Sequence, residues 1–195
     1  MALSSDVPAG ATRAVRLMGE ELVAWRSAAG AVQVWEDRCP HRGMRLSYGF
    51  VRGERLACLY HGWEYGTGAS CQRIPAHPDL TVPASIKVQA WQVAEAGGLI
   101  WAGRDAGAPP TLPERSPLAS LSIRCAPARF LATIGSGDGP MVSTTRGGVS
   151  LHLGWHQSAD DEFMLHAAVD TGTDRTAALA VLRSLRSDLE AEMAA

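Results

Sequence analysis

Two short stretches, CPHRG and CLYHGW, each place a cysteine just before a histidine. Cys39 and His41 are separated by one residue, Cys58 and His61 by two, and sixteen residues lie between His41 and Cys58. Two thiolates and two imidazoles can hold one zinc ion tetrahedrally, or two irons bridged by sulfide. The fold must therefore bring two loops together around a metal centre, and the spacing alone leaves both kinds of centre open.

The composition argues against a nucleic-acid-binding or membrane protein. The 195 residues are 46% hydrophobic, enough for a sizeable core, and their net charge of −2 provides no basic field for a phosphate backbone. The start, MALSSDVPAGATRAV, lacks the basic and apolar regions of a secretory signal, and no run approaches the roughly 18 apolar residues of a membrane span. We expect a cytoplasmic protein, whose four reduced cysteines point to metal or redox chemistry.

A small all-β domain is predicted between Ala14 and Ala102. Apolar or alternating runs are separated there by AAG, GE, GTG and GG turn signals. The runs are AVRLMG, ELVAWRS, AVQVWED, RLACLYH, IKVQAWQVAEA and LIWAG. Pro40 and Gly43 flank the first histidine and Gly62 follows the second, so both Cys/His stretches are predicted to lie in turns.

A second, smaller unit is predicted beyond the proline-rich stretch AGAPPTLPERSP, which has no hydrophobic period and indicates a linker. Strands are expected at CAPARFLATI, PMVSTT, VSLHLGWHQ and EFMLHAAV, with GSGDG and SADD as turns. The predicted fold is mainly β. It has a β-sandwich domain at residues 1–107, a linker at 108–118, and an α+β unit at 119–195 made of antiparallel strands and a C-terminal helix.

The C-terminal helix is predicted from its cap and its apolar spacing. Thr173 is the candidate N-cap. The positions that recur at helical spacing after it are Ala178, Leu182, Leu185, Leu189 and Met193. The tail is therefore expected to form an amphipathic helix packed on the small sheet.

CPHRG, CLYHGW and the downstream GTGASCQRIP together resemble the Rieske domain of ring-hydroxylating and demethylating oxygenase alpha subunits. The resemblance covers roughly residues 14 to 105. It implies a Rieske-type β-sandwich with one 2Fe-2S cluster, in which Cys39 and Cys58 hold the inner iron and His41 and His61 the outer one. Replacing two thiolates by neutral imidazoles raises the reduction potential above that of four-cysteine clusters.

Differences from the respiratory-chain branch of Rieske proteins narrow the expected reduction potential. Respiratory-chain Rieske proteins place an extra cysteine in each loop and a serine after the second HG, where this sequence has Met44, Tyr60 and Trp63. Without that disulfide and one hydrogen bond, the potential is expected near −150 mV rather than +300 mV. Tyr60 and Trp63 are candidates to cover the cluster, although ordinary core aromatics beside a turn give the same pattern.

The catalytic iron site that the resembled oxygenases carry is not evident in this sequence. Residues 119–195 contain no D-x2-H-x4-H pattern. On an extended strand the α-carbons of His152 and His156 lie about 13 Å apart, too far for one ion. A hairpin near Ser158 to Asp161 would set His152 opposite His166, but ordinary polar-face histidines are the favoured expectation.

The remaining metal-binding residue types are expected to be structural. His77 in IPAHP is predicted at the surface, and Cys71 and Cys125 are predicted as thiols that bind no iron, with Cys125 beginning a strand.

The predicted function is single-electron transfer from a reductase to a separate catalytic oxygenase subunit, in a homo- or hetero-oligomer. Two alternatives stay open: a compact atypical oxygenase with its own mononuclear iron in the C-terminal unit, and a non-catalytic redox-responsive protein.

Overall fold

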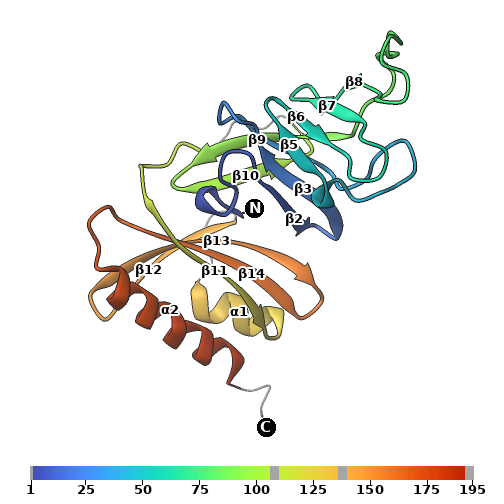
Figure 1. Ribbon diagram of the computed structural model, residues 1–195. Coiled ribbons are helices and arrows are strands. Elements are labelled where there is room, and N and C mark those ends of the chain that lie inside the picture. The colour runs from blue at the N-terminus through green and yellow to red at the C-terminus, as the bar shows by residue number, and fades with distance from the viewer. Residues whose placement is uncertain (1, 106–109, 136–139, 192–195) are drawn as a thin grey trace.

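Three antiparallel β-sheets and two α-helices make up the part of the chain that this computed structural model describes, residues 2–105, 110–135 and 140–191 (Figure 1). The six-stranded sheet has the order β1 (Ala2–Leu3), β10 (Leu99–Gly103), β9 (Ala90–Ala96), β4 (Val32–Glu36), β3 (Glu20–Arg26) and β2 (Thr12–Leu17). A small sheet has the order β5 (Phe50–Arg52), β6 (Arg55–Ala57), β7 (Glu64–Gly66) and β8 (Cys71–Arg73). The C-terminal sheet has the order β11 (Ser116–Arg124), β14 (Glu162–Val169), β13 (Val149–Ala159) and β12 (Met141–Arg146).

Helices α1 (Pro127–Ile134) and α2 (Arg175–Glu190) lie on one face of the C-terminal sheet, and the short 3-10 turns η1 (Ser4–Asp6) and η2 (Leu46–Tyr48) belong to the first half of the chain (Figure 1). The predicted mainly β fold with a C-terminal helix is confirmed. None of the helices in the described residues is long and apolar enough to cross a bilayer.

Strands β3 and β4 are buried on both faces, which is why ELVAW reads as an almost continuous apolar run. Leu22, Ala24 and Val34 pack towards β1, β2 and β10. Trp25 and Trp35 pack on the other side, against the small sheet and its loops. The six-stranded sheet is thus the shared wall between two apolar layers.

The C-terminal sheet has one apolar face and one polar face. Alternate residues of β13 and β14, such as Leu153 and Leu165, pack with Leu182 and Leu185 of α2. The opposite face points towards the first half of the chain, where Ala168 contacts Leu3 and Leu99. The two halves therefore meet through the N-terminal strand β1 and its neighbours.

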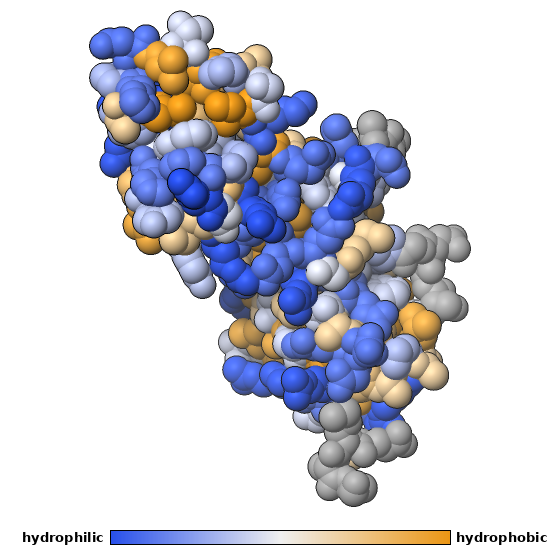
Figure 2. Space-filling view, turned by 90° about the vertical axis from the view of Figure 1, so that its right-hand side faces the viewer, coloured by the Kyte–Doolittle hydropathy of each residue, from blue (hydrophilic) through white to orange (hydrophobic). Residues whose placement is uncertain are grey.

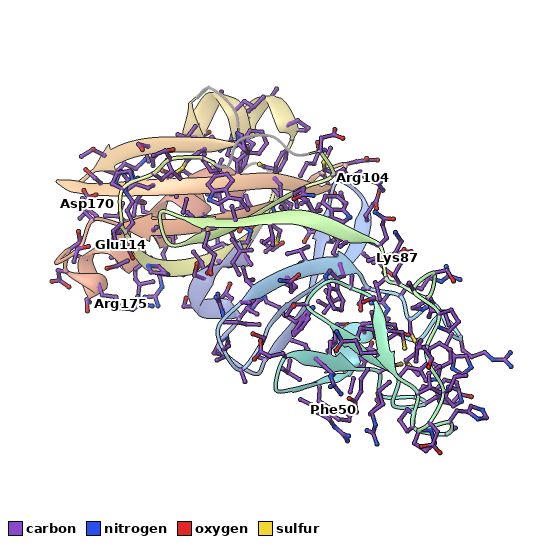
Figure 3. The ribbon with its side chains drawn as sticks, turned by 90° about the horizontal axis from the view of Figure 1, so that it is seen from above. Phe50, Lys87, Arg104, Glu114, Asp170 and Arg175 are labelled. Atoms are coloured by element: carbon purple, nitrogen blue, oxygen red, sulfur yellow. The ribbon has the colours of Figure 1, made fainter. Side chains whose placement is uncertain are left out.

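The halves form opposite ends of the molecule. Phe50 and Lys87 lie at one end, and Glu114, Asp170 and Arg175 lie at the other (Figure 3).

The prediction of a strand at CAPARFLATI is wrong, because Pro127 starts helix α1 there. Proline has no N–H to lose at the first helical position, and its fixed φ suits a helix start. Phe130 and Ile134, four residues apart, are buried on one side of that helix. Cys125 accordingly follows β11 and does not begin a strand.

Two further boundaries differ from the predictions. Strand β11 begins at Ser116, so the end of the predicted linker, residues 116–118, is in a sheet. The N-cap of α2 is Asp174, not Thr173, since the Asp174 side chain accepts hydrogen bonds from the N–H groups of Thr176 and Ala177. The predicted apolar face is buried as far as Leu189, and Met193 lies outside the described residues.

A buried carboxylate joins the four strands of the small sheet. The Glu64 side chain on β7 is only 4% exposed and lies 2.8 Å from Arg73, 3.0 Å from Arg55 and 3.5 Å from Arg52. Burial by itself raises the pKa of Glu64, but the hydrogen bonds from Arg55 and Arg73 outweigh it and hold that pKa below its usual value.

We predict that Glu64→Gln lowers the free energy of unfolding at neutral pH by about 1.5–3 kcal/mol, because hydrogen bonds to a charged group are lost. The folded-state pKa is lowered, so this stability is present above the ordinary carboxyl pKa and is lost as the pH falls through the folded value. Anaerobic urea unfolding between pH 7 and pH 3 should therefore show the two proteins converging in acid. Glu36→Gln, at an exposed position, is the control, and an equal loss in both variants would contradict the prediction.

Candidate metal centre

The two Cys/His loops are built by the same pair of backbone hydrogen bonds. In the first loop the Cys39 N–H donates to the Met44 carbonyl at 2.8 Å, and the Gly43 N–H donates to the Cys39 carbonyl at 2.8 Å. The loop at residues 58–63 repeats both bonds, from the cysteine N–H to the carbonyl five residues on and from the glycine N–H back to the cysteine, at 2.9 and 3.0 Å. The local sequence therefore folds both stretches into equivalent loops.

Each loop closes on a glycine with a left-handed backbone. Gly43 has φ +72° and Gly62 has φ +67°, a region that side chains with a Cβ rarely adopt. A Cβ on Gly62 would also lie 3.1 Å from Cγ of Pro75. Glycine is needed at these positions for the turn itself.

The four predicted ligand residues are arranged from the inside to the outside of the domain. Cys39 and Cys58 are each 2% exposed and belong to the core beneath the loops. His61 is exposed and His41 is half-buried, with their ring centroids 4.5 Å apart. Two sulfurs thus lie inward of two adjacent imidazoles.

His41 Nδ1 is the observation that tests whether this set fits a cluster. The atom is buried and has no hydrogen-bond partner among the described residues. Burial, followed by the nearby His61 and Arg42, lowers the pKa of His41, so the ring is neutral, the form that binds metal. A buried, unpartnered imidazole nitrogen beside two thiols fits a bond to iron.

In the described part of the chain, no three His, Cys, Asp or Glu side chains converge on a place for one ion. A 2Fe-2S cluster with two protein donors on each iron does not require such a convergence.

Aromatic rings cover both imidazoles. Trp63 stacks on His41 with centroids 4.3 Å apart and planes 6° apart. The ring centroids of Tyr60 and His61 are 3.8 Å apart, with the two rings tilted to one another. Tyr60 is 59% exposed. Trp63 therefore fixes the orientation of one imidazole, while Tyr60 forms part of the surface.

Tyr65 is a site residue that the sequence reasoning missed. Its hydroxyl lies 3.1 Å from Cys39 Sγ, and the whole residue is buried. Burial raises the pKa of Tyr65, so it keeps its proton and can donate to a thiolate. The sequence signal is its place two residues after Trp63: its strand, β7, begins directly after the second Cys/His loop.

The other predicted positions lie as follows. His77 is exposed. Cys71 is buried in the same core as Cys39 and Cys58, with its Sγ 3.7 Å from the Arg73 carbonyl, and Cys125 is buried in the C-terminal core.

The hairpin register that would set His152 opposite His166 is wrong, and the C-terminal histidines lie on the polar face of the sheet but are buried there. His166 lies opposite Gly154, and His152 lies opposite Ala168. His152, His156 and His166 are between 3% and 8% exposed and not on a solvated face. The reason is tertiary: the first half of the chain covers this polar face of the sheet, and the Arg16 carbonyl accepts a hydrogen bond from His156.

Comparison with known proteins identifies the domain that carries the two Cys/His loops. Residues 1–89 match the family model of the Rieske [2Fe-2S] domain. These residues are a Rieske domain, whose cofactor is one Rieske-type 2Fe-2S cluster.

Two curated relatives come from Pseudomonas putida. Oxidoreductase NdmD is 41% identical over 102 residues, which are 52% of this chain and 17% of that protein. Methylxanthine N1-demethylase NdmA is 44% identical over 88 residues, 45% of this chain and 25% of that protein. The chain thus spans a quarter or less of the length of these relatives.

The likeness in fold extends beyond the Rieske domain. A crystal structure of apo dicamba monooxygenase superposes on 98% of this chain and 81% of that chain, with a TM-score of 0.72 and 20% sequence identity. The C-terminal sheet and helices therefore share that fold as well.

Gly62→Ala is predicted to destabilise the second loop by about 1–2 kcal/mol, the usual cost of a left-handed backbone for a residue with a Cβ. The contact with Pro75 adds to this cost. Urea unfolding and the iron content after purification measure the effect. Gly68→Ala is the matched control, because Gly68 lacks a positive φ and nothing lies within 4 Å of its added Cβ. Equal stability and iron content in the two variants would refute this account of the loop.

Tyr65→Phe is predicted to lower the reduction potential of the cluster by a few tens of millivolts. The hydroxyl stabilises negative charge on Cys39 Sγ, and one hydrogen bond corresponds to a shift of this size in a one-electron couple. A redox titration followed by EPR measures the shift. Tyr60→Phe, which removes an exposed hydroxyl from the ring beside His61, should leave the potential unchanged; a larger shift there would disprove the role of Tyr65.

Proposed function

We propose that Cys39 and Cys58 hold the inner iron of the 2Fe-2S cluster and that His41 and His61 hold the outer iron. The buried thiols, the unpartnered His41 Nδ1 and the two matching loops support this assignment. When bound, such a cluster accepts and releases one electron at a time.

The protein residues have separate tasks in this proposal. Cys39 and Cys58 keep the inner iron out of water, and Trp63 and Tyr65 hold the ligands in place. His61 is exposed beside Leu59 and Tyr60, which are 56% and 59% exposed. Hydrophobic residues gather at the upper end of the molecule in Figure 2, the end formed by the Rieske domain. A partner that docks there would exclude water around the outer imidazoles.

We infer that the chain is an electron-transfer component of a Rieske oxygenase system. It accepts an electron from a reductase and passes it to a catalytic oxygenase subunit, with which it forms a homo- or hetero-oligomer in the cytoplasm. The observation that carries this proposal is an exposed imidazole, His61, beside the half-buried His41 and above two buried thiols in a Rieske domain. The proposal also includes a Rieske domain at residues 1–107, a linker that ends before β11 begins at Ser116, and a C-terminal unit beyond it. It further includes a reduction potential near −150 mV.

The ligand assignment is tested on anaerobically purified protein. We predict two irons and two acid-labile sulfides per chain, and a rhombic Rieske signal in the EPR spectrum after dithionite reduction. His61→Ala should abolish that signal, because the outer iron loses a ligand. His77→Ala, at an exposed histidine outside the two Cys/His loops, is the control and should retain it. Retention of the signal in His61→Ala would overturn the assignment.

The electron-transfer role has a separate test. Stopped-flow mixing with a reduced reductase should bleach the oxidised cluster, and mixing the reduced protein with an oxidised oxygenase partner should restore its colour. A cluster that is present but exchanges electrons with neither component would contradict the function and leave the ligand assignment standing.

A further inference from the structure

A cavity of about 240 Å³ lies between strand β2 and the polar face of the C-terminal sheet. His156 from β13 and His166 from β14 both line it, and they are 8% and 3% exposed. In Figure 1 this place lies where β2 faces β13 and β14, away from the loops of the Rieske cluster. Neither histidine has a part in the proposed electron transfer.

The hydrogen bonds of His166 fix which of its nitrogens carries the proton. Ser120 Oγ donates its only hydrogen to Asp6 Oδ2 at 2.9 Å. At the bond of 2.8 Å between Ser120 Oγ and His166 Nδ1, the imidazole must therefore be the donor. His166 Nε2 then carries a lone pair, and this atom is buried without a partner among the described residues.

The same reasoning applies to His156. Its Nε2 lies 2.8 Å from the Arg16 carbonyl, which can only accept, so Nε2 carries the hydrogen. His156 Nδ1 then carries the lone pair, and it too is buried without a partner in the described part of the chain. Each ring therefore keeps one free lone pair.

The two rings are close and neutral. Their centroids are 5.4 Å apart and their planes differ by 16°. Burial is the main cause that lowers the pKa of His156 to about 4 and that of His166 to about 2, so neither ring is charged at neutral pH. Each ring donates a hydrogen bond from its other nitrogen, His156 to a backbone carbonyl and His166 to a serine that is held by a carboxylate. Metal-binding histidines in proteins make the same kind of hydrogen bond.

The two arginines that line the cavity each have a carboxylate beside them. Arg13 lies 3.8 Å from Asp6 and Arg16 lies 3.9 Å from Glu21, so each of these cations has an anionic partner. Glu162, which also lines the cavity, accepts a hydrogen bond from Ser122 and brings a further carboxylate.

We propose that His156 and His166 form a second metal site, for a divalent ion that prefers imidazole ligands, such as zinc. The protein supplies two donors, since no three metal-binding side chains converge in the described residues, and water or a small ligand completes the coordination. The groups that set both tautomers, the Arg16 carbonyl and Asp6, come from the first half of the chain. The site is therefore complete only when the two halves are docked, and the ion stabilises their docking.

The test uses protein with full iron and sulfide content, dialysed against Zn²⁺ and analysed for metals. His156→Gln keeps a donor for the Arg16 carbonyl and His166→Asn keeps one for Ser120, but each variant lacks the free imidazole nitrogen. His152→Gln is the matched control, because His152 is equally buried on the same sheet face and both its nitrogens are already bonded, to Ser143 at 2.8 Å and Asp170 at 3.0 Å.

We expect about one zinc per chain beyond the cluster iron in the unmodified protein and in His152→Gln. Zinc affinity should fall at least tenfold in His156→Gln and in His166→Asn. Ser120→Ala should weaken zinc binding about 10–100-fold, because the His166 tautomer loses its support. This last variant leaves both ligands in place, so it decides the question if a histidine variant fails to fold.

Two results would overturn the proposal. If the unmodified protein, with its cluster intact, retains no zinc, the free nitrogens do not bind a metal and instead accept hydrogen bonds from water. If zinc is retained equally by all the variants, the ion binds elsewhere.

Discussion

The packing of the small sheet against β3 and β4 is the contact on which the metal centre depends. Strands β5 to β8 have three residues each, so their own ladders provide few hydrogen bonds. Trp25 and Trp35, edge to face with centroids 4.9 Å apart, give them an apolar wall. Cys39 and Cys58 are buried in the same cluster of side chains as these indoles. Because of this contact the two sulfurs are buried while the two imidazoles lie further out. An electron would therefore leave on the imidazole side.

The two halves of the chain are joined by a mixed interface. Leu3, Leu99 and Ala168 form its apolar part. Its polar part consists of two hydrogen bonds: Ser120, which also bonds His166, donates to the Asp6 carboxylate, and His156 donates to the Arg16 carbonyl. Buried polar groups are costly unless they are partnered, so these bonds fix the orientation of the halves more strictly than apolar contact would. The same bonds prepare the lone pairs that we assign to a second metal.

Local sequence features predicted the centre better than they predicted the C-terminal unit. The Cys/His spacing and the glycines at 43 and 62 were sufficient for the loops, because a left-handed turn is specified within a few residues. CAPARFLATI was mistaken for a strand because its apolar residues fit either element, and the decisive signal was Pro127 at the helix start. Tyr65 was missed because its contact with Cys39 spans 26 residues.

The sequence by itself determined the mainly β architecture, the Rieske domain and the four residues proposed to bind its cluster, since these depend on short motifs and on the periodicity of single strands. It also indicated the apolar face of α2, which is set by spacing along one helix. Only the tertiary structure decided the register of β13 and β14 and the burial of His152, His156 and His166. Alternation shows that one face of a strand is polar, but whether water or another part of the protein covers that face depends on residues far away in the chain.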